Sequence, residues 1–238
     1  MDPAYAQRYR DLYERHWWWR ARERLILDVL NTLVPAGGWR AILDVGCGDG
    51  LFFDRLSAFG AVEGVELDAA LVSERGRQRR IHIGPFDARF QPGKRYGLIL
   101  MLDVLEHMPD PTGALRHAVD LLEPEGTMLI TLPAFNLLWT NHDRLNRHLT
   151  RYTRRSFAMV ARAAGVRVCR SRYFFHWVFP AKLAVRLIET TLRLAPAPPR
   201  MPPRWTNRLL SLLSRGEQLT LGKLRLPLGS SLLVVAGK

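Results

Sequence analysis

Residues Ala41–Gly50, AILDVGCGDG, decide the fold of this chain. The stretch begins with apolar residues typical of a short buried strand and continues with glycines at every second position, Gly46, Gly48 and Gly50. Because glycine has no Cβ, such a turn allows the backbone to approach a ligand closely. The spacing differs from the G-x-G-x-x-G of dinucleotide-binding folds, and Asp44 precedes the glycines. The pattern therefore favours a ligand that carries an ammonium group and no phosphate.

A second acidic residue follows at the end of the next expected strand, residues 62–68 with the sequence VEGVELD. A carboxylate at the tip of the second strand of a nucleotide-binding βαβ unit can accept hydrogen bonds from both ribose hydroxyls. Glu66 has this position. S-adenosylmethionine combines a ribose with an ammonium group and lacks a phosphate, so we expect it as the cofactor.

Strand-like apolar runs alternate with helical patterns along most of the chain. This alternation predicts an α/β fold, a Rossmann-like, doubly wound, mostly parallel seven-stranded sheet, whose last two strands pair antiparallel at one edge. The glycine loop is expected to open directly into a helix at residues 51–56, and a further helix is expected to carry the arginines of residues 75–80. The remaining expected strands are residues 81–84, 96–102, 127–132, 166–174 and 231–236.

We expect four regions: an N-terminal helical lid (1–36), a Rossmann-like core that binds the cofactor (37–174), a basic helical insertion (175–228) and the final strand of the core (229–238). The lid contains HWWWR at residues 16–20. Three successive tryptophans point around most of a helix, so at least one must face something other than the main core. Trp18 is our candidate for contact with a substrate, with contact to a membrane and simple packing of the lid as the alternatives.

Composition indicates one globular domain with an uneven charge. The chain has 238 residues and a net charge of +13, and residues 140–238 hold 19 Lys and Arg against 3 Asp and Glu. Such an uneven charge favours a surface that meets anionic groups, either phospholipid headgroups or nucleic acid, and a solvated basic surface is the alternative. Cys47 and Cys169 are too few for a disulfide framework or a metal cluster, and residues 1–24 lack an apolar leader segment. We therefore expect a cytoplasmic protein.

Four motifs, in order, resemble the class I S-adenosylmethionine-dependent methyltransferase family: ILDVGCGDG, GVELD, LDVLEHMPDP and LLEPEGTMLITLP. The resemblance implies that the glycine loop approaches the methionine part of the cofactor and that the acid after the second strand binds the ribose. It also implies that the loop after the third strand contacts adenine and that the acid after the fourth strand flanks the transferring methyl group. The cofactor-binding positions are Asp44, Gly46, Cys47, Gly48, Gly50, Glu66, Leu67, Asp87, Ala88 and Asp103.

The motif after the fourth strand narrows the resemblance. DVLEH is similar to small-molecule enzymes, including the O-methyltransferases of quinone biosynthesis, whereas enzymes that methylate base amines have Asn/Asp-Pro-Pro-aromatic at this place. Many relatives have Phe-Asp before the fourth strand, where this chain has Tyr96-Gly97. In the family that acid supports the fold more than the chemistry. We therefore expect the chain to be active without it.

Methyl transfer to an alcohol or phenol gains from a base, and histidine is the side chain that titrates near neutral pH. The candidate bases are His107, after the fourth strand, and His142 and His148, in the loop that follows the fifth strand. Arg151 and Tyr152 are candidates for orienting the acceptor, with an ion pair between Arg151 and a neighbouring aspartate as the alternative.

The D-x-x-E-H cluster of Asp103, Glu106 and His107 is also similar to one thought to hold a divalent metal in some quinone-pathway relatives. Carboxylates and one imidazole could suit Mg²⁺ or Zn²⁺. We favour a helix-capping loop without a metal.

The basic insertion contains two amphipathic patterns, residues 178–194 and 204–219, with basic stripes on wide apolar faces. Such helices are typical of interfacial helices on anionic lipid, and the alternative is a cap over the acceptor pocket or a contact with another subunit. We therefore expect a methyltransferase that acts on a small, lipophilic or lipid-linked acceptor, at oxygen, on the inner membrane face. The alternatives are a nucleic-acid methyltransferase, which the missing base-amine motif disfavours, and a non-catalytic cofactor-binding protein.

Overall fold

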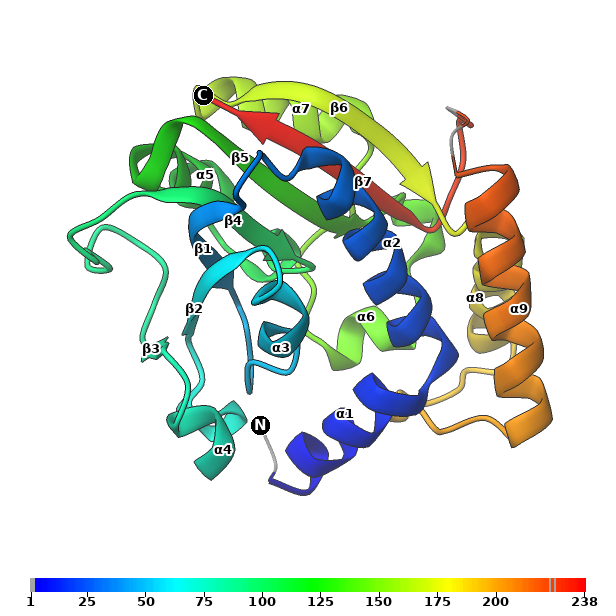
Figure 1. Cartoon of the computed structure of the whole chain (residues 1–238). Helices are drawn as coiled ribbons and strands as arrows, with labels where there is room; N and C mark the ends of the chain where they lie inside the picture. Colours follow the sequence, from blue (N-terminus) through cyan, green and yellow to red (C-terminus); the bar gives the residue numbers. More distant parts are fainter. Residues whose placement is uncertain (1–2, 223, 225) are drawn as a thin grey trace.

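The computed structural model describes residues 3–222, 224 and 226–238, with side chains from residue 9 onwards. Residues 1, 2, 223 and 225, which belong to the predicted lid and insertion, lie outside the described residues. Figure 1 shows the elements, which in chain order are α1 (Pro3–Arg15), α2 (Trp17–Leu33), β1 (Trp39–Val45), α3 (Phe53–Leu56), β2 (Gly60–Glu66), η1 (Ala69–Leu71), α4 (Glu74–Arg77), β3 (Ile81–Ile83), β4 (Tyr96–Leu102), η2 (Leu105–His107), α5 (Pro111–Leu121), β5 (Leu122–Pro133), η3 (Asn136–Leu138), α6 (Asn141–Leu145), α7 (Arg154–Ala163), β6 (Arg167–Phe174), α8 (Val178–Thr191), α9 (Arg204–Thr220) and β7 (Ser231–Gly237).

The strands form one seven-stranded sheet in the order β3-β2-β1-β4-β5-β7-β6. Strands β1 to β5 pair in parallel, and β7 is antiparallel to both β5 and β6. The predicted fold class and the antiparallel pairing of the last two strands are confirmed, although β7 lies inside the sheet and β6 forms its edge. The strand order reverses between β1 and β4. Doubly wound sheets bind their ligands beside such a point, at the carboxyl ends of the strands.

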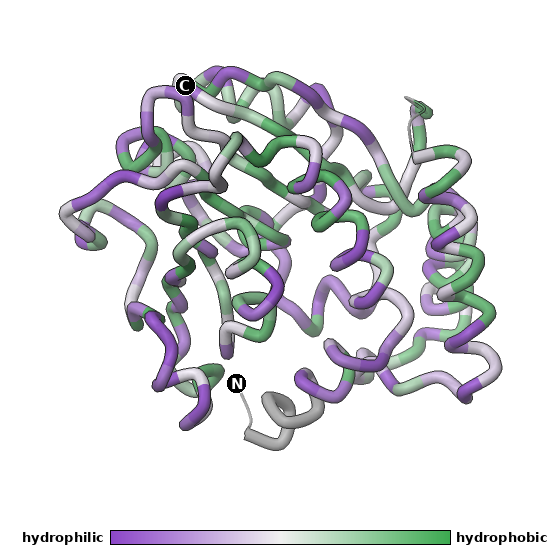
Figure 2. Tube along the Cα trace, viewed as in Figure 1, coloured by the Kyte–Doolittle hydropathy of each residue, from purple (hydrophilic) through white to green (hydrophobic). Residues whose placement is uncertain are grey.

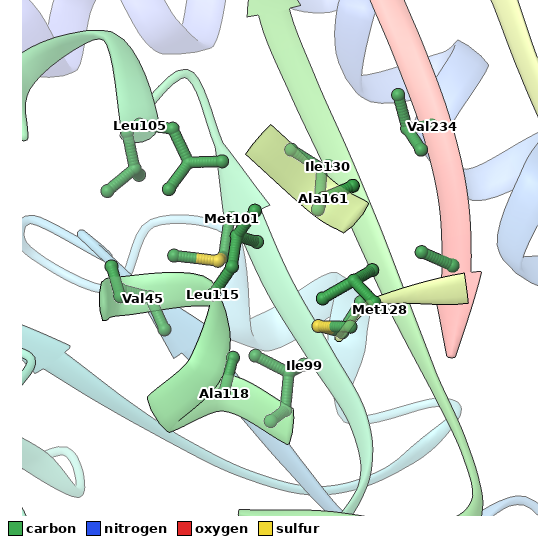
Figure 3. Close-up of a cluster of buried hydrophobic side chains, with 14 of the residues drawn as sticks. Val45, Ile99, Met101, Leu105, Leu115, Ala118, Met128, Ile130, Ala161 and Val234 are labelled. Atoms are coloured by element: carbon green, nitrogen blue, oxygen red, sulfur yellow. The ribbon is translucent and has the colours of Figure 1, made fainter. Parts of the chain in front are cut away.

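Both faces of the sheet are buried, which explains why β4 is a continuous apolar run. Ile99 and Met101 join a cluster covered by α5 and α7, which Figure 3 shows. Leu98 and Leu100 join a second cluster on the opposite face, where α2 covers the sheet. Complete burial of such a side chain is worth roughly 1.5–3 kcal/mol, so these two layers hold the strand ends rigidly in place.

Three local expectations were wrong. The helix after the glycine loop is one turn long, Phe53–Leu56, and α4 ends at Arg77. The Arg79 guanidinium donates hydrogen bonds to the Gly50 carbonyl oxygen and to Asp54, which draws the chain back to the loop. Strand β5 begins at Leu122, before the expected start at residue 127, since Leu122 pairs with Tyr96 and the register shifts between this pair and the next.

The N-terminal helices and the insertion pack on each other beside the sheet. Helix α1 ends before His16, and α2 begins after it. His16 Nδ1 accepts a hydrogen bond of 3.1 Å from the Trp18 backbone N–H. Helix α9 packs along α2, and Gln218 donates to the Ala21 carbonyl oxygen at 2.7 Å. The predicted domain boundaries stay a prediction. None of the described helices combines the length and apolar composition needed to cross a bilayer.

Candidate active site

The glycine loop between β1 and α3 adopts backbone conformations that favour glycine. Gly46, Gly48 and Gly50 have φ angles of 70°, 54° and 67°. A Cβ on Gly46 would lie 2.7 Å from Val104 Cγ2, whereas no described atom lies within 4 Å of the Cβ position of Gly48. Gly46 therefore serves the packing of the loop, and Gly48 presents bare backbone to open space that a ligand can use.

Glu66, at the end of β2, is held against this loop by two backbone hydrogen bonds. Its carboxylate accepts from the Gly48 N–H at 2.8 Å and from the Asp68 N–H at 3.0 Å. An ionised carboxylate has about four acceptor positions, so roughly two remain for the hydroxyls of a ribose. The residues present therefore fit the nucleoside part of S-adenosylmethionine.

Asp44 supplies a buried negative charge at the end of β1. Burial raises the pKa of Asp44 to about 7, with the positive charge of Arg22 opposing this shift and the carboxylate of Glu66 adding to it. An ammonium or sulfonium group placed here would favour the ionised form. The donor set thus fits a cationic ligand, as expected from the sequence.

The other expected cofactor positions lie around the loop. Burial raises the pKa of the Cys47 thiol, which makes it a packing residue rather than a nucleophile. Leu67 follows β2 and is 71% exposed, and Asp87 and Ala88 lie in the loop after β3. The Asp87 carboxylate pairs with Arg89 at 2.6 Å. Contact of these residues with adenine stays a prediction.

The N-terminal helices close over the glycine loop, a contact that the sequence did not reveal. Arg10 on α1 donates hydrogen bonds to Asp49 of the loop and, at 3.0 Å, to the Ser73 hydroxyl. The pocket between the lid and the loop, lined in part by Trp19 and Asp44, has a volume of about 60 Å³. Ligand sites of enzymes commonly measure about 300–1,000 Å³, so a nucleoside can enter after movement of the lid.

The three successive tryptophans differ in their surroundings, although Trp17 and Trp18 both pack against Phe175. The Trp17 ring packs on Trp177 at 5.2 Å between centroids. The Trp18 ring lies 5.6 Å from the Arg22 guanidinium. Trp19 lines the pocket above the glycine loop. The structure places the Trp18 ring against Arg22 and brings Trp19 to the pocket, and contact of Trp18 with an acceptor stays a prediction.

Asp103, directly after β4, has a φ angle of 57°, which is uncommon for a residue other than glycine. Arg22 Nη2 lies 2.7 Å from its carboxylate, and the Thr131 hydroxyl donates to it at 3.2 Å. Backbone strain of this kind is found at functional sites, where surrounding contacts maintain it. The lid helix α2 is therefore tied to the strand end where the methyl group is expected.

Two of the three candidate histidines lie together, and Asp143, in the first turn of α6, contacts one of them. His148 Nδ1 lies 2.8 Å from the Asp143 carboxylate, and the His148 ring meets the His107 ring edge to face at 4.7 Å between centroids. The His142 ring is farther from His148, at 6.3 Å. We assign the Nδ1 proton of His148 to its bond with Asp143, which leaves Nε2 as a proton acceptor.

Asp143 is fully buried and strongly bound. Burial by itself would raise its pKa, but the hydrogen bond from His148 and the charge of Arg151 hold the pKa well below its usual range. Arg151 Nε donates to Asp143 at 2.8 Å, and Thr140 completes a capping box with it at the start of α6. Asp143 is thus a permanent anion that orients His148.

Arg151 and Tyr152 were expected to contact the acceptor, and the structure buries both. Arg151 is 3% exposed and donates to Asp143 and to the Ala134 carbonyl oxygen. Tyr152 is also 3% exposed, its hydroxyl donates to the Leu105 carbonyl oxygen, and burial raises its pKa to about 12. The ion pair of Arg151 with Asp143 is the alternative that the sequence left open, and contact of either residue with an acceptor stays a prediction.

Glu106 is the second buried carboxylate of this site. Within the described part of the chain neither of its carboxylate oxygens has a hydrogen-bond partner, and burial and then the charge of Asp103 raise its pKa well above the usual range. Glu106, His107 and His148 offer ligand atoms within 4.8 Å of one another, which would suit a divalent metal. This group differs from the cluster expected from the sequence, which contained Asp103 instead of His148. The Asp103 carboxylate pairs with Arg22.

Comparison of this chain with known proteins identifies its family. A family model described as a methyltransferase domain matches residues 18–170. The chain belongs to this methyltransferase family. The class and the cofactor expected from the glycine loop, a methyltransferase that uses S-adenosylmethionine, are thereby confirmed, and the matched region begins in the lid and includes the site described above.

Curated relatives of this methyltransferase include two enzymes named ubiquinone biosynthesis O-methyltransferase. The enzyme of Xanthomonas euvesicatoria is 28% identical over 206 residues, which cover 80% of this chain and 77% of that enzyme. The enzyme of Albidiferax ferrireducens is 31% identical over 144 residues, which cover 52% of this chain and 56% of that enzyme. The match thus spans little more than half the length of the second relative.

Solved structures share the fold of this methyltransferase. A chain from the complex of the Haloferax volcanii Trm112 methyltransferase activator with its methyltransferase has a TM-score of 0.61 at 16% identity, and the match covers 98% of this chain and 94% of that one. A TehB-like S-adenosylmethionine-dependent methyltransferase of Corynebacterium glutamicum has a TM-score of 0.56 at 19% identity, covering 99% and 96%.

Proposed function

We propose that this methyltransferase methylates a hydroxyl oxygen of a small, lipophilic or lipid-linked acceptor, with His148 as the general base. The observation that carries the proposal is the 2.8 Å contact between His148 Nδ1 and the buried Asp143 carboxylate. A base oriented by a carboxylate in this way is suited to take up the proton of an attacking hydroxyl.

Each residue of the site has a stated task in this proposal. Asp44 and Glu66 hold the amino group and the ribose of the cofactor, and Gly48 allows its close approach. When bound, the cofactor supplies a methyl group on a positively charged sulfur, which is already activated. His148 Nε2 receives the hydroxyl proton as the oxygen acquires the methyl group, and later releases it to water. Glu106 and His107 form the wall of the site beside His148.

The names of the relatives support oxygen as the acceptor atom. Both are named as O-methyltransferases of ubiquinone biosynthesis. Transfer of that chemistry to this chain is part of the proposal, because the identities are modest and one match covers about half of the relative.

Helices α8 and α9 support a lipophilic acceptor and a membrane surface as its source. Leu187 and Ile188 on α8 are 61% and 50% exposed, and Trp205 and Leu212 on α9 are 72% and 62% exposed. Figure 2 shows hydrophobic and hydrophilic residues interspersed along both helices. Exposed leucine and tryptophan beside arginine are characteristic of helices that lie on anionic lipid. We therefore include peripheral association with an anionic membrane face in the proposed function.

The test supplies the protein with S-adenosylmethionine labelled in its methyl group and offers a bacterial lipid extract, total RNA or a small phenol. We expect label in an alkali-stable ether of the lipid or phenol fraction. Label in RNA alone would replace the proposal with nucleic-acid methylation. Binding of cofactor without transfer to any of the three would favour a non-catalytic role.

A further inference from the structure

A pocket distinct from the methyl-transfer site lies where α1 meets α2, against the first half of α9. It has a volume of about 480 Å³. Asn207 on α9 fixes its base, because its side chain accepts from the Trp17 N–H at 2.8 Å and donates to the Arg15 carbonyl oxygen at 2.8 Å. The pocket is therefore built by contacts between segments that lie far apart in the sequence.

Five arginines line this pocket, and one acid, Glu14, lies among them. The five are Arg15, Arg20, Arg24, Arg204 and Arg208. Arg15 pairs with Asp11 and Arg20 pairs with Glu23, whereas the other three have no carboxylate partner among the described residues. The pocket thus holds an excess of positive charge that the protein itself does not neutralise.

Arg24 is the centre of this excess charge. Its Nη2 donates a weak hydrogen bond of 3.3 Å to the Ser211 hydroxyl, and its buried Nε has no partner within the described residues. Desolvation, followed by repulsion from Arg215 and Arg20, lowers its pKa from the ordinary arginine value, against a weaker attraction from Asp28 and Glu23. An unmatched guanidinium among like charges costs free energy, which an anion with several oxygens would recover.

We propose that this pocket binds a phosphate group through Arg24, Arg204 and Arg208. Arginine clusters recognise phosphate because the planar guanidinium donates two parallel hydrogen bonds to its oxygens. The pocket opens beside Leu212, which lines it, and near Trp205 and Leu209, which are 72% and 48% exposed. These apolar neighbours favour the headgroup of an anionic phospholipid as the source of the phosphate. This choice of source rests on the membrane association in the proposed function.

The first experiment measures binding of inorganic phosphate, pyrophosphate and dihexanoyl phosphatidylglycerol below its micelle concentration, by calorimetry. We expect the short-chain lipid to bind best. Arg24→Gln together with Arg208→Gln should weaken it at least about tenfold, because charge-assisted hydrogen bonds are lost. The control, Arg155→Gln together with Arg162→Gln, removes the same charge from exposed positions of α7 and should bind as the wild type does. Arg208→Gln alone, at an exposed position, guards against misfolding and should give part of the loss.

The second experiment separates this pocket from membrane association as a whole. Vesicles of phosphatidylcholine receive equal surface charge from either phosphatidylglycerol or oleate, which has no phosphate. We expect the wild type to prefer phosphatidylglycerol and the Arg24/Arg208 variant to bind both equally. If the wild type binds both vesicles equally and none of the soluble phosphates, the pocket proposal fails while membrane association stands. If it binds soluble pyrophosphate but neither vesicle, the pocket stands, its source is a free phosphate, and the membrane part of the proposed function fails.

Discussion

The buried Asp143 carboxylate lies 2.8 Å from His148 Nδ1 and 2.8 Å from Arg151 Nε, and so joins a framework ion pair to the candidate base. Arg151 keeps Asp143 ionised, and ionised Asp143 keeps the Nδ1 proton on His148. The imidazole therefore presents Nε2 in a fixed direction before any acceptor arrives, as general-base catalysis requires.

Replacement of this base should slow methyl transfer. We expect His148→Gln to lower kcat by about 10²–10⁴-fold, the usual contribution of a general base, with the affinity for the cofactor unchanged. His142→Gln is the matched control, because His142 is exposed and its ring contacts Asn146 instead of a carboxylate, so its rate should stay within about threefold. Activity lost in EDTA and restored by a divalent metal would assign His148 to a metal with Glu106 and His107 instead.

The stability of the protein should fall in acid because of Asp143. The pKa of this carboxyl is held well below the usual value of about 3.9, so the unfolded state binds the proton first, and the stabilisation is lost as the pH falls below about 4. In Asp143→Asn, the free energy of unfolding should be lower at neutral pH by about 3–5 kcal/mol, because Arg151 stays buried without its partner. Denaturant unfolding between pH 3 and pH 7 would show a flatter pH dependence in the variant. Equal slopes in the two proteins would contradict this role of Asp143.

The fold could be predicted because its signals are local. The apolar run of β4 and the glycines after β1 each depend on a few neighbouring residues, and the alternation of strands with helices indicates a mostly parallel sheet. Glu66 could be found in the same way, since its role depends on its position at a strand end.

The contacts that complete the site could not be read from the sequence, because they join distant segments. Arg22 on α2 reaches Asp103 at the carboxyl end of β4, and Arg10 on α1 reaches Asp49 in the glycine loop. The ion pair that buries Arg151 was expected only as the alternative, for another reason. An arginine after a histidine-rich loop looks like a substrate ligand unless the aspartate that faces it is known to be fully buried.

Binding of the cofactor should strengthen as the pH rises through neutrality. Asp44 has a pKa of about 7, raised chiefly by burial, and a cationic ligand favours its ionised form. From pH 6 to pH 8 we expect the affinity for S-adenosylmethionine to rise by about tenfold, and in Asp44→Asn this pH dependence should disappear. Calorimetry across this range measures both. In the free protein the sign is opposite, since a raised pKa makes the folded state bind more protons and its stability falls between about pH 4 and pH 7.

The contact between Arg10 and Asp49 should control how fast the cofactor leaves. Because the closed pocket is too narrow for a nucleoside, release requires the lid to lift from the glycine loop. Arg10→Gln should raise the dissociation rate constant by about three- to fivefold, measured by stopped-flow displacement. Arg15→Gln removes an exposed ion pair on the same helix and should leave the rate unchanged. An unchanged rate in Arg10→Gln would show that another contact limits opening.

Association with anionic vesicles should depend on the exposed leucines of α8 and α9. Leu187 on α8 is 61% exposed, and its transfer from water into the lipid interface should contribute about 1 kcal/mol, so Leu187→Ser should weaken binding about fivefold. Met159 on α7 is 62% exposed, and Met159→Ser should have no effect if α7 faces water when the protein is bound. Flotation with phosphatidylglycerol vesicles measures both variants. Each substitution removes an exposed side chain, so the thermal stability of both variants should match that of the wild type. Loss of vesicle binding can then be distinguished from unfolding. If α8 and α9 lie on the vesicle, a substitution on α8 must weaken binding more than one on α7. Equal weakening by the two substitutions would mean that the protein binds vesicles without a preferred face.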